Sequence, residues 1–194
     1  MSDCQEDFKG DSTCSLWDAA ISSASDEAMR GELASVRDGN DEMSLPEKLT
    51  KEDESKVEGE VVLSMIRDFP IPKKIKLALF GNKSVRAVLI RDTNKMIPLF
   101  VLENARISEE EVLEFAKSTT VADAVLREIS GKSQWTKNYA VKQAITSNPK
   151  TPVDVALRWI KYLEAKHLKQ LSKSKSISSV VATQCRKLLE KRQH

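Results

Sequence analysis

The chain has 194 residues and a formal net charge of only +2, but its two parts carry opposite charge. Residues 1–70 contain 7 Lys and Arg against 18 Asp and Glu, whereas residues 71–194 contain 24 against 11. The longest apolar run, residues 96–102, is far shorter than the ~20 residues of a membrane helix, and no basic segment followed by an apolar run opens the chain. We therefore expect no membrane partner, no secretory signal and a cytoplasmic location.

Residues 1–55 are rich in Ser, Asp, Glu and Gly and poor in large apolar side chains. Low hydrophobicity combined with high like charge does not offset the entropy lost on ordering. We expect residues 1–55 to be an acidic, mostly disordered tail and residues 56–194 to be a basic α-helical domain. Residues 15–36 carry a weak apolar stripe. For this segment two alternatives stay open, a transiently helical stretch or a short helix that docks on another surface.

The basic part begins with an expected end-capping helix over residues 58–67. Two prolines, Pro70 and Pro72, follow it closely. Proline lacks the backbone N–H that a helix interior needs, so the helix has to end before them.

Asparagine recurs at regular intervals along the basic part. Asn82, Asn104 and Asn148 each follow a short apolar helical segment, with spacings of 22 and 44 residues. Residues 148–159 align with residues 104–115, and more distant copies occupy residues 118–129 and 174–185. A period of this size is typical of stacked helical units.

Each copy reads as a polar turn followed by a capped helix. Ser108 with Glu111, and Thr120 with Asp123, fit capping boxes, and Pro152 suits the first helical position. Apolar residues then follow at helical spacing, and no segment alternates with a period of two. The pattern predicts an all-α fold, a right-handed α-solenoid of short helical repeats in which each unit buries the apolar stripe of the next.

The turn sequence NPKTP at residues 148–152 resembles turns of leucine-rich-repeat-variant and HEAT-like proteins. The blocks at residues 74–95 and 135–152 are similar to a group of uncharacterised bacterial helical-repeat proteins with the same blocks in the same order. The resemblance covers most of residues 70–192 and implies a helical-repeat fold, but no assigned activity. Leucine-rich-repeat-variant proteins can carry an iron–sulfur cluster, but Cys4 and Cys14 supply too few thiolates for one.

Residue patterns typical of catalysis are absent from the sequence. The three cysteines are too scattered for a zinc site, and there is no HExxH pair or glycine-rich phosphate loop. A surface or boundary position is the simpler interpretation for His167, helix-dipole stabilisation for Glu109 to Glu111, and burial on an apolar face for Cys185. We predict no enzymatic activity, no catalytic residues, no metal site and no cofactor.

Clustered basic residues give the best functional indication. The candidate interaction surface consists of Lys74, Lys83, Arg86, Arg91, Lys95, Trp135, Lys137, Lys173 and Lys175. Trp135 combined with basic neighbours could stack a nucleic-acid base, although packing at a repeat junction is the simpler role for its ring.

We expect a non-catalytic scaffold or adaptor that binds a protein partner, because solenoids present extended binding surfaces. The alternative is nucleic-acid binding by the basic domain, modulated by the acidic tail. That tail either folds back onto the basic body, at a high effective concentration, or only improves solubility.

Overall fold

The computed structural model describes residues 11–40, 43–52 and 59–193. All regular structure in these residues is helical, and none of them forms a strand, so the expected all-α class is confirmed. No helix within these ranges is long and apolar enough to cross a lipid bilayer. The helices are α1 Asp11–Ser22, α2 Glu27–Arg37, α3 Glu47–Thr50, α4 Gly59–Ile66, α5 Ile71–Phe80, α6 Lys83–Leu89, α7 Met96–Val101, α8 Glu109–Lys117, α9 Asp123–Gly131, α10 Ser133–Thr136, α11 Tyr139–Ser147, α12 Val153–Trp159, the 3-10 helix η1 Ile160–Tyr162, α13 Ala165–Lys173 and α14 Ser179–Gln193.

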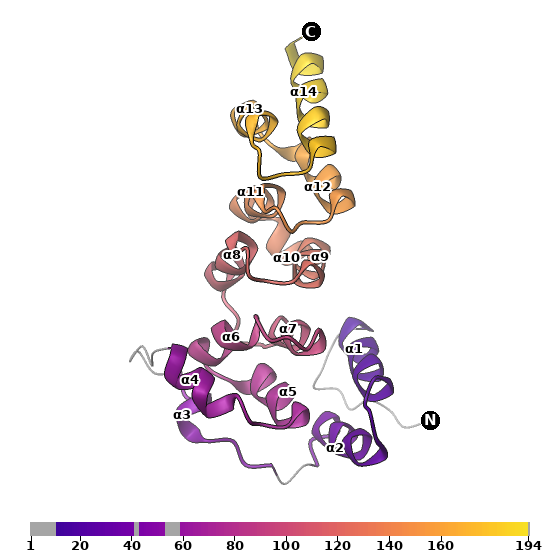
Figure 1. Ribbon diagram of the computed structural model, residues 1–194, viewed down its shortest axis with the longest axis vertical. Helices are drawn as coiled ribbons and strands as arrows, with labels where there is room; N and C mark the ends of the chain where they lie inside the picture. The colour runs from indigo at the N-terminus through magenta and orange to yellow at the C-terminus, as the bar shows by residue number, and fades with distance from the viewer. Residues whose placement is uncertain (1–10, 41–42, 53–58, 194) are drawn as a thin grey trace. The chain divides into compact units, whose positions relative to one another are not determined.

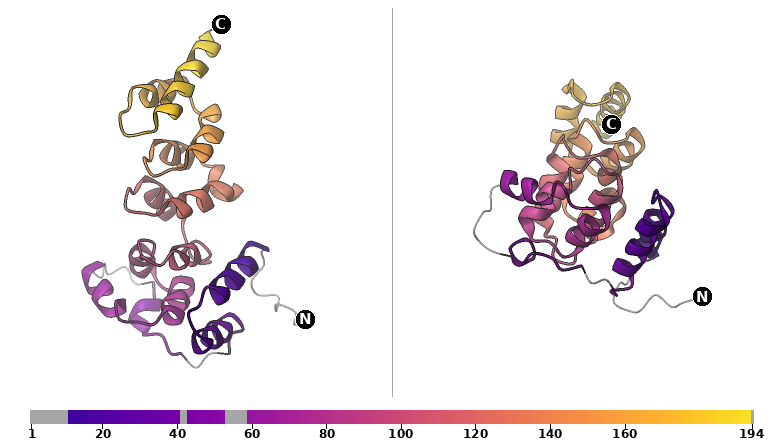
Figure 2. Two further views of the ribbon diagram at one scale, coloured as in Figure 1. Left: turned by 45° about the vertical axis from the view of Figure 1, so that its right-hand side comes forward. Right: turned by 60° about the horizontal axis from the view of Figure 1, so that its bottom comes forward.

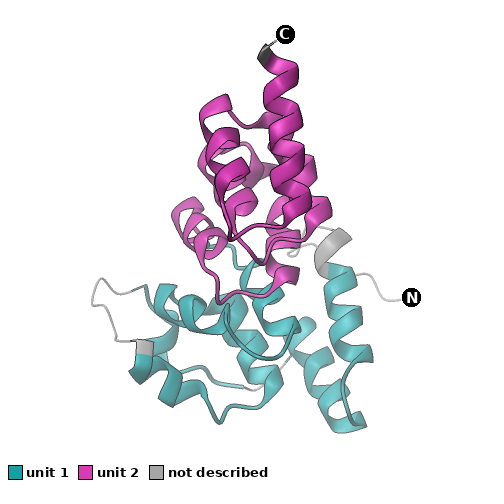
Figure 3. Ribbon diagram, turned by 45° about the horizontal axis from the view of Figure 1, so that its top comes forward, with its two compact units in different colours: residues 1–107 teal, residues 108–194 magenta. Residues whose placement is uncertain are grey.

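The chain divides into two compact units, coloured separately in Figure 3: unit 1 is residues 1–107 and unit 2 is residues 108–194. This division differs from the expected boundary between residues 55 and 56. The segment that we expected to be a tail contributes three helices to unit 1, α1 to α3, so its described residues are part of a folded unit.

Helices α1 and α2 show why composition misjudged this segment. They pack on each other, α2 packs on α5 and α1 packs on α7 (Figures 1 and 2). The buried Trp17 ring lies 4.6 Å from the ring of Phe100, and Leu33 and Val36 are also buried. A few well-placed apolar side chains therefore outweigh the low average hydrophobicity of the segment. The expected disorder of residues 1–10, 41–42 and 53–55 lies outside the described residues.

A second contact within unit 1 joins the acidic part of the sequence to the basic part. Arg86 of α6 is only 2% exposed, and its Nη1 lies 2.6 Å from Oε1 of Glu52. The same nitrogen donates to the carbonyl of Gly81, and Lys83 donates its backbone N–H to Glu52. This buried guanidinium holds the end of the α3 segment against α6.

The recurring asparagines share one geometry. Each of Asn82, Asn104 and Asn148 is buried, and its side-chain amide donates to two backbone carbonyls of an earlier segment at 2.8–3.3 Å. Each side-chain oxygen accepts a backbone N–H two or three residues ahead. An amide with one acceptor and two donors is needed for this role, which explains why asparagine recurs at these positions.

Glycine is required at Gly81 by the same packing. A Cβ there would clash with the carbonyl oxygen of Leu77 and with the side chain of Val85. The carbonyl of Gly81 in turn accepts hydrogen bonds from Arg86 and Asn104.

The helices of unit 2 lie in two rows, with α8, α11 and α13 in one row and α9, α12 and α14 in the other (Figure 1). Helix α11 packs on α8, and α14 packs on α12 and α13, while α9, α10 and α12 contact α11 (Figures 1 and 2). Its last part buries Leu168, Leu171 and Cys185 in one cluster. Burial raises the pKa of the Cys185 thiol, which keeps it protonated and inert.

Four turns lie the same number of residues before the start of a helix. The turns at Asn104, Ser118, Asn148 and Ser174 are each followed five residues later by the first residue of α8, α9, α12 or α14. In the second and fourth turns a serine hydroxyl lies 2.8 Å from the hydroxyl two residues ahead, Thr120 or Ser176, and accepts its backbone N–H at 3.3 Å. The turns aligned in the sequence therefore share local structure.

One of the three predicted helix starts is confirmed. Ser108 and Glu111 form the expected capping box at the start of α8. Thr120 was a wrong choice, because its hydroxyl contacts Ser118 and α9 begins after Ala122. Pro152 lies one position earlier than expected, as the N-cap residue of α12.

Candidate functional site

The five predicted cations of unit 1 fall into two groups. Two of them have structural roles: Arg86 is buried against Glu52, and Lys74 lies 3.6 Å from Asp92 and is largely covered. We had expected both to be part of a free basic surface, but both are neutralised within the unit. Lys83, Arg91 and Lys95 are exposed, and Arg91 also donates to the carbonyl of Ala87.

Among the predicted residues of unit 2, the lysines are exposed and the aromatic residue is not. Trp135 is 4% exposed, with the ammonium of Lys132 above its ring at 4.8 Å. It is therefore a packing residue and cannot stack a base, as the simpler interpretation held. Lys137, Lys173 and Lys175 are at the surface.

A cavity of about 830 Å³ opens on unit 1 where α4, α5 and α6 meet. Helix α4 packs on α6 through the buried Val62 and Ile66 and leaves Val61, Leu63 and Met65 exposed. The cavity is lined by Glu60, Leu63, Ile66, Arg67, Lys74, Val88, Leu89, Arg91, Asp92 and Thr93. It thus combines apolar side chains with charged ones of both signs, among which the basic side chains are in excess.

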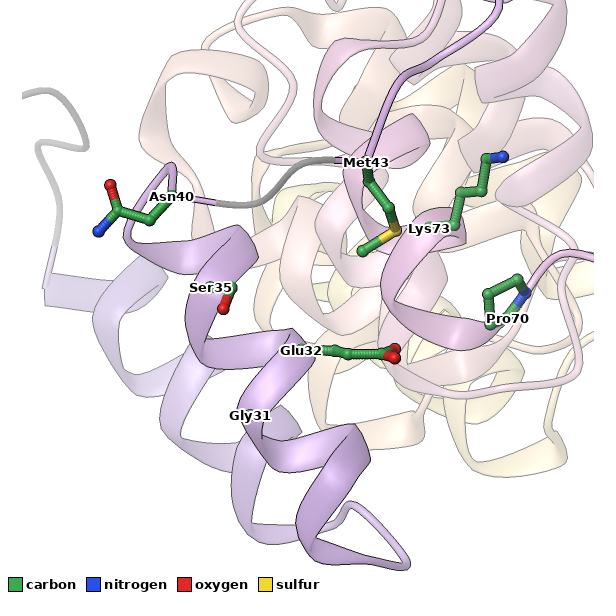
Figure 4. Close-up of a pocket in the computed structure, with 7 residues that line it drawn as sticks. All are labelled: Gly31, Glu32, Ser35, Asn40, Met43, Pro70 and Lys73. Atoms are coloured by element: carbon green, nitrogen blue, oxygen red, sulfur yellow. The ribbon is translucent and has the colours of Figure 1, made fainter.

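A second cavity, of about 800 Å³, lies between α2 and α5 (Figure 4). It is lined mainly by polar or small residues, and Met43 and Pro70 are its apolar members. Glu32 extends from α2 toward α5, whereas the side chain of Asn40 points away from the other labelled residues. Lys73 has its ammonium 4.3 Å from the centre of the Phe69 ring. This cavity offers less apolar surface to a ligand than the cavity at α4, α5 and α6.

One aromatic cluster in unit 2 was missed by the sequence reasoning. Tyr162 is 64% exposed, and its ring lies 5.7 Å from the ring of Trp159. The ammonium of Lys142 is 5.9 Å from the centres of both rings. In the described part of the chain, the buried indole N–H of Trp159 has no hydrogen-bond partner. The three residues come from α11, α12 and η1, so only the fold brings them together.

His167 has a structural partner. Its Nδ1 lies 2.7 Å from the hydroxyl of Tyr139, which accepts the backbone N–H of Glu164 at 3.0 Å. Tyr139 thereby links α11 to the start of α13 and is not a free aromatic surface.

Metal-ligating side chains do not converge within the described ranges. No group of three or more His, Cys, Asp or Glu residues there could hold a metal ion. Cys14 is exposed and Cys185 is buried, and neither forms a disulfide within the described residues. The described geometry is that of packed helices, with the cavities at α4, α5 and α6 and at α2 and α5 and an exposed aromatic cluster around Tyr162.

Comparison of the chain with protein-family models, with curated proteins and with solved structures found no match.

Proposed function

We propose that the protein is a non-catalytic helical-repeat scaffold, of the right-handed α-solenoid type, that binds another protein. The repeat interpretation is supported by the four turns with a common offset and by the asparagines with a common hydrogen-bond geometry. The two rows of helices in unit 2 are the arrangement that such repeats produce. We group the chain with leucine-rich-repeat-variant and HEAT-like proteins on these local features.

The observation that carries the binding function is the cavity at α4, α5 and α6. Leu63 is 52% exposed in its lining, and Ile66, Val88 and Leu89 are the other apolar residues there. Val61 and Met65 are also exposed on α4, but they lie two residues from Leu63 and so face another side of the helix. Exposed large apolar side chains gathered on one helix are typical of interaction sites, whereas isolated ones need no explanation. The volume of about 830 Å³ is enough for several side chains of a partner.

Charge in the cavity lining defines the partner further. Arg67 and Arg91 belong to the lining together with one acid, Glu60, that has no ion-pair partner among the described residues. Lys74 and Asp92 pair with each other, so the net charge there is positive. An amphipathic helix matches this surface when its apolar face contacts Leu63 and Val88 and its flanking Asp or Glu residues face the two arginines. The partner that we propose is therefore a protein segment with apolar residues at helical spacing and acidic flanks.

Site-specific photocrosslinking tests this function. A photoreactive phenylalanine analogue replaces Leu63 in the full chain, and the matched control carries it at Val180 of α14, which is similarly exposed at 50%. We expect position 63 to crosslink an acidic, amphipathic segment of one partner. A synthetic peptide of that segment should then bind the native chain and should lose affinity for the Leu63→Asp variant.

Three results would contradict the proposal: equal crosslinking at both positions, a crosslinked segment that is basic, or a small molecule as the occupant of the cavity. The Leu63→Asp variant remains interpretable because the side chain is exposed, and circular dichroism would confirm that it folds.

A further inference from the structure

The last part of unit 2 carries a concentrated and unneutralised positive charge. Residues 160–193 contain nine Lys and Arg against two Asp and Glu. None of the nine forms an ion pair within the part of the chain that the structure describes. Arg192 is the one with a structural role, because it donates to the carbonyls of Lys161 and Leu163 at 2.7 and 2.6 Å.

Helix α13 aligns three of these cations. Lys166, Lys169 and Lys173 are spaced by three and four residues, so they share one side of the helix. Leu168 and Leu171 occupy the other side and are buried in the core of the unit. Because the apolar side is fixed inward, the three lysines face solvent as a stripe.

An exposed aromatic residue lies close to this stripe along the chain. Tyr162 ends η1, three residues before the first residue of α13. The two hydrogen bonds from Arg192 hold the backbone on either side of Tyr162, so its ring is presented by an ordered segment. Trp159 lies beside it and Lys142 contributes a further cation, with its ammonium near both rings.

We propose that this surface, defined by Tyr162, Lys142 and the α13 lysines, binds single-stranded nucleic acid. The ring of Tyr162 offers a face on which one unpaired base stacks, and the lysine stripe neutralises the phosphates of the neighbouring nucleotides. In a duplex the faces of the bases are covered by their neighbours, so an exposed ring favours a single strand. An acidic protein would use the lysines but would not need an exposed aromatic ring.

The site lies in unit 2 and shares no residue with the cavity at α4, α5 and α6. It is therefore independent of the proposed protein partner, and either proposal can fail alone.

The test measures fluorescence anisotropy of labelled oligothymidylate and oligouridylate, about 12 nucleotides long, with the full chain. We expect binding at about 50 mM salt that weakens steeply toward about 200 mM. Tyr162→Ala should lower the affinity about tenfold, because stacking on an aromatic ring contributes at that level. Tyr162→Phe keeps the ring and should bind like the native chain.

The combined variant Lys166→Gln, Lys169→Gln and Lys173→Gln tests the stripe. It should reduce the slope of log affinity against log salt by about 2, because each lost phosphate contact contributes about 0.7 for a single strand. A matched variant removes three exposed lysines of unit 1, Lys48→Gln, Lys83→Gln and Lys95→Gln, and should leave the slope unchanged.

Comparison of the two oligonucleotides shows whether the natural ligand class is DNA or RNA. No binding of either oligonucleotide at about 50 mM salt would overturn the proposal. An affinity that falls in the lysine variant but not in Tyr162→Ala would overturn it as well. Binding of a polyglutamate peptide as tight as that of the oligonucleotides would assign the surface to an acidic protein. Circular dichroism checks each variant for folding, and all of the changed side chains are exposed.

Discussion

The two units use their positive charge differently. In unit 1 several cations of residues 71–107 hold the fold together, although Lys83, Arg91 and Lys95 are exposed. Arg86 contacts Glu52, Lys74 contacts Asp92, and Lys76 donates to the carbonyl of Met43. Arg106 donates to the carbonyls of Thr50 and Phe80. Their partners come partly from residues 43–52, which belong to the acidic part of the sequence. The opposite charges of the two sequence regions thus meet inside one folded unit.

In unit 2 the cations of residues 160–193 are mostly at the surface. Within the described residues none of them has a carboxylate partner, and one ion pair elsewhere in the unit, Arg127 with Asp154, is exposed. Clusters of basic residues with similar composition can therefore stabilise the fold, as in unit 1, or remain at the surface where a ligand can reach them, as in unit 2. Burial and partners distinguish the two cases, and composition does not.

The largest expected effect on stability is at Arg86. Removing one partner of a fully buried pair costs about 3–5 kcal/mol, and the 41% exposure of the Glu52 side chain reduces the expected loss for Arg86→Met to about 2–3 kcal/mol. Lys83→Met, on the same helix but exposed, should change the free energy of unfolding by less than about 0.5 kcal/mol. Urea unfolding measures both variants. Equal stability of the two would show that Arg86 is not structural.

The second-largest effect on stability is expected at the buried asparagines, and because they occur in both units their contributions to stability can be compared. Asn104→Ala in unit 1 removes the donor to the carbonyl of Ala78 and one of the two donors to that of Gly81, and Asn148→Ala in unit 2 removes the donor to the carbonyls of Ala116 and Ser118. We expect each to lower the free energy of unfolding by about 1–2 kcal/mol. Asn40→Ala, at an exposed position, is the control. If one buried variant behaved like the control, the shared role of the asparagines would be wrong.

A smaller effect on stability is expected when the pH is lowered and Glu52 becomes protonated. Partial burial by itself raises the pKa of Glu52. Hydrogen bonds from Arg86 and from the Lys83 backbone, together with the charges of Arg86 and Arg106, lower it by more, so the pKa of the folded state lies below the usual 4.5. The stabilisation is therefore present above that value and is lost as the pH falls through the lower pKa of the folded state. Thermal unfolding between neutral and acidic pH should show a loss in the native chain that is reduced in Glu52→Gln. An unchanged acid profile in that variant would exclude this ion pair as its source.

The smallest effect is expected from the lysines of α13. The combined Lys166→Gln, Lys169→Gln and Lys173→Gln variant should unfold within about 0.5 kcal/mol of the native chain, because exposed, unpaired side chains contribute little. The free energy of unfolding of this variant is to be compared with that of Arg86→Met in unit 1. A loss as large as that at Arg86 would mean that these lysines also stabilise the fold, and the contrast between the units would disappear.

The sequence predicted local features better than tertiary ones. The all-α class and the Ser108 capping box follow from patterns within a few residues, and both are present. The role of Arg86 depends on Glu52, which lies 34 residues earlier, so no local pattern could separate this residue from an exposed cation. Trp17 similarly finds its partner in Phe100 across α1 and α7, which made a segment of low hydrophobicity part of the fold.

The aromatic cluster shows the same limit at the candidate site. Trp135 and Tyr162 are both aromatic residues near lysines, and nothing in the adjacent sequence distinguishes the buried ring from the exposed one. The available signal was the position of Tyr162 in the short segment that joins two amphipathic helices. Only the fold brings Lys142, Trp159 and Tyr162 together from three elements.

The contrast between Arg86 and Lys74, which hold the fold of unit 1, and the α13 lysines of unit 2, which we propose bind a single strand, has one direct measurement. It is an NMR titration of the isotope-labelled full chain with oligothymidylate, following the backbone amide signals residue by residue. We expect the shifted signals to belong to η1, α13 and the adjoining parts of α11 and α12, while those of α5 and α6 stay in place. Shifts centred on Lys83, Arg91 and Lys95, with none around Tyr162, would contradict it.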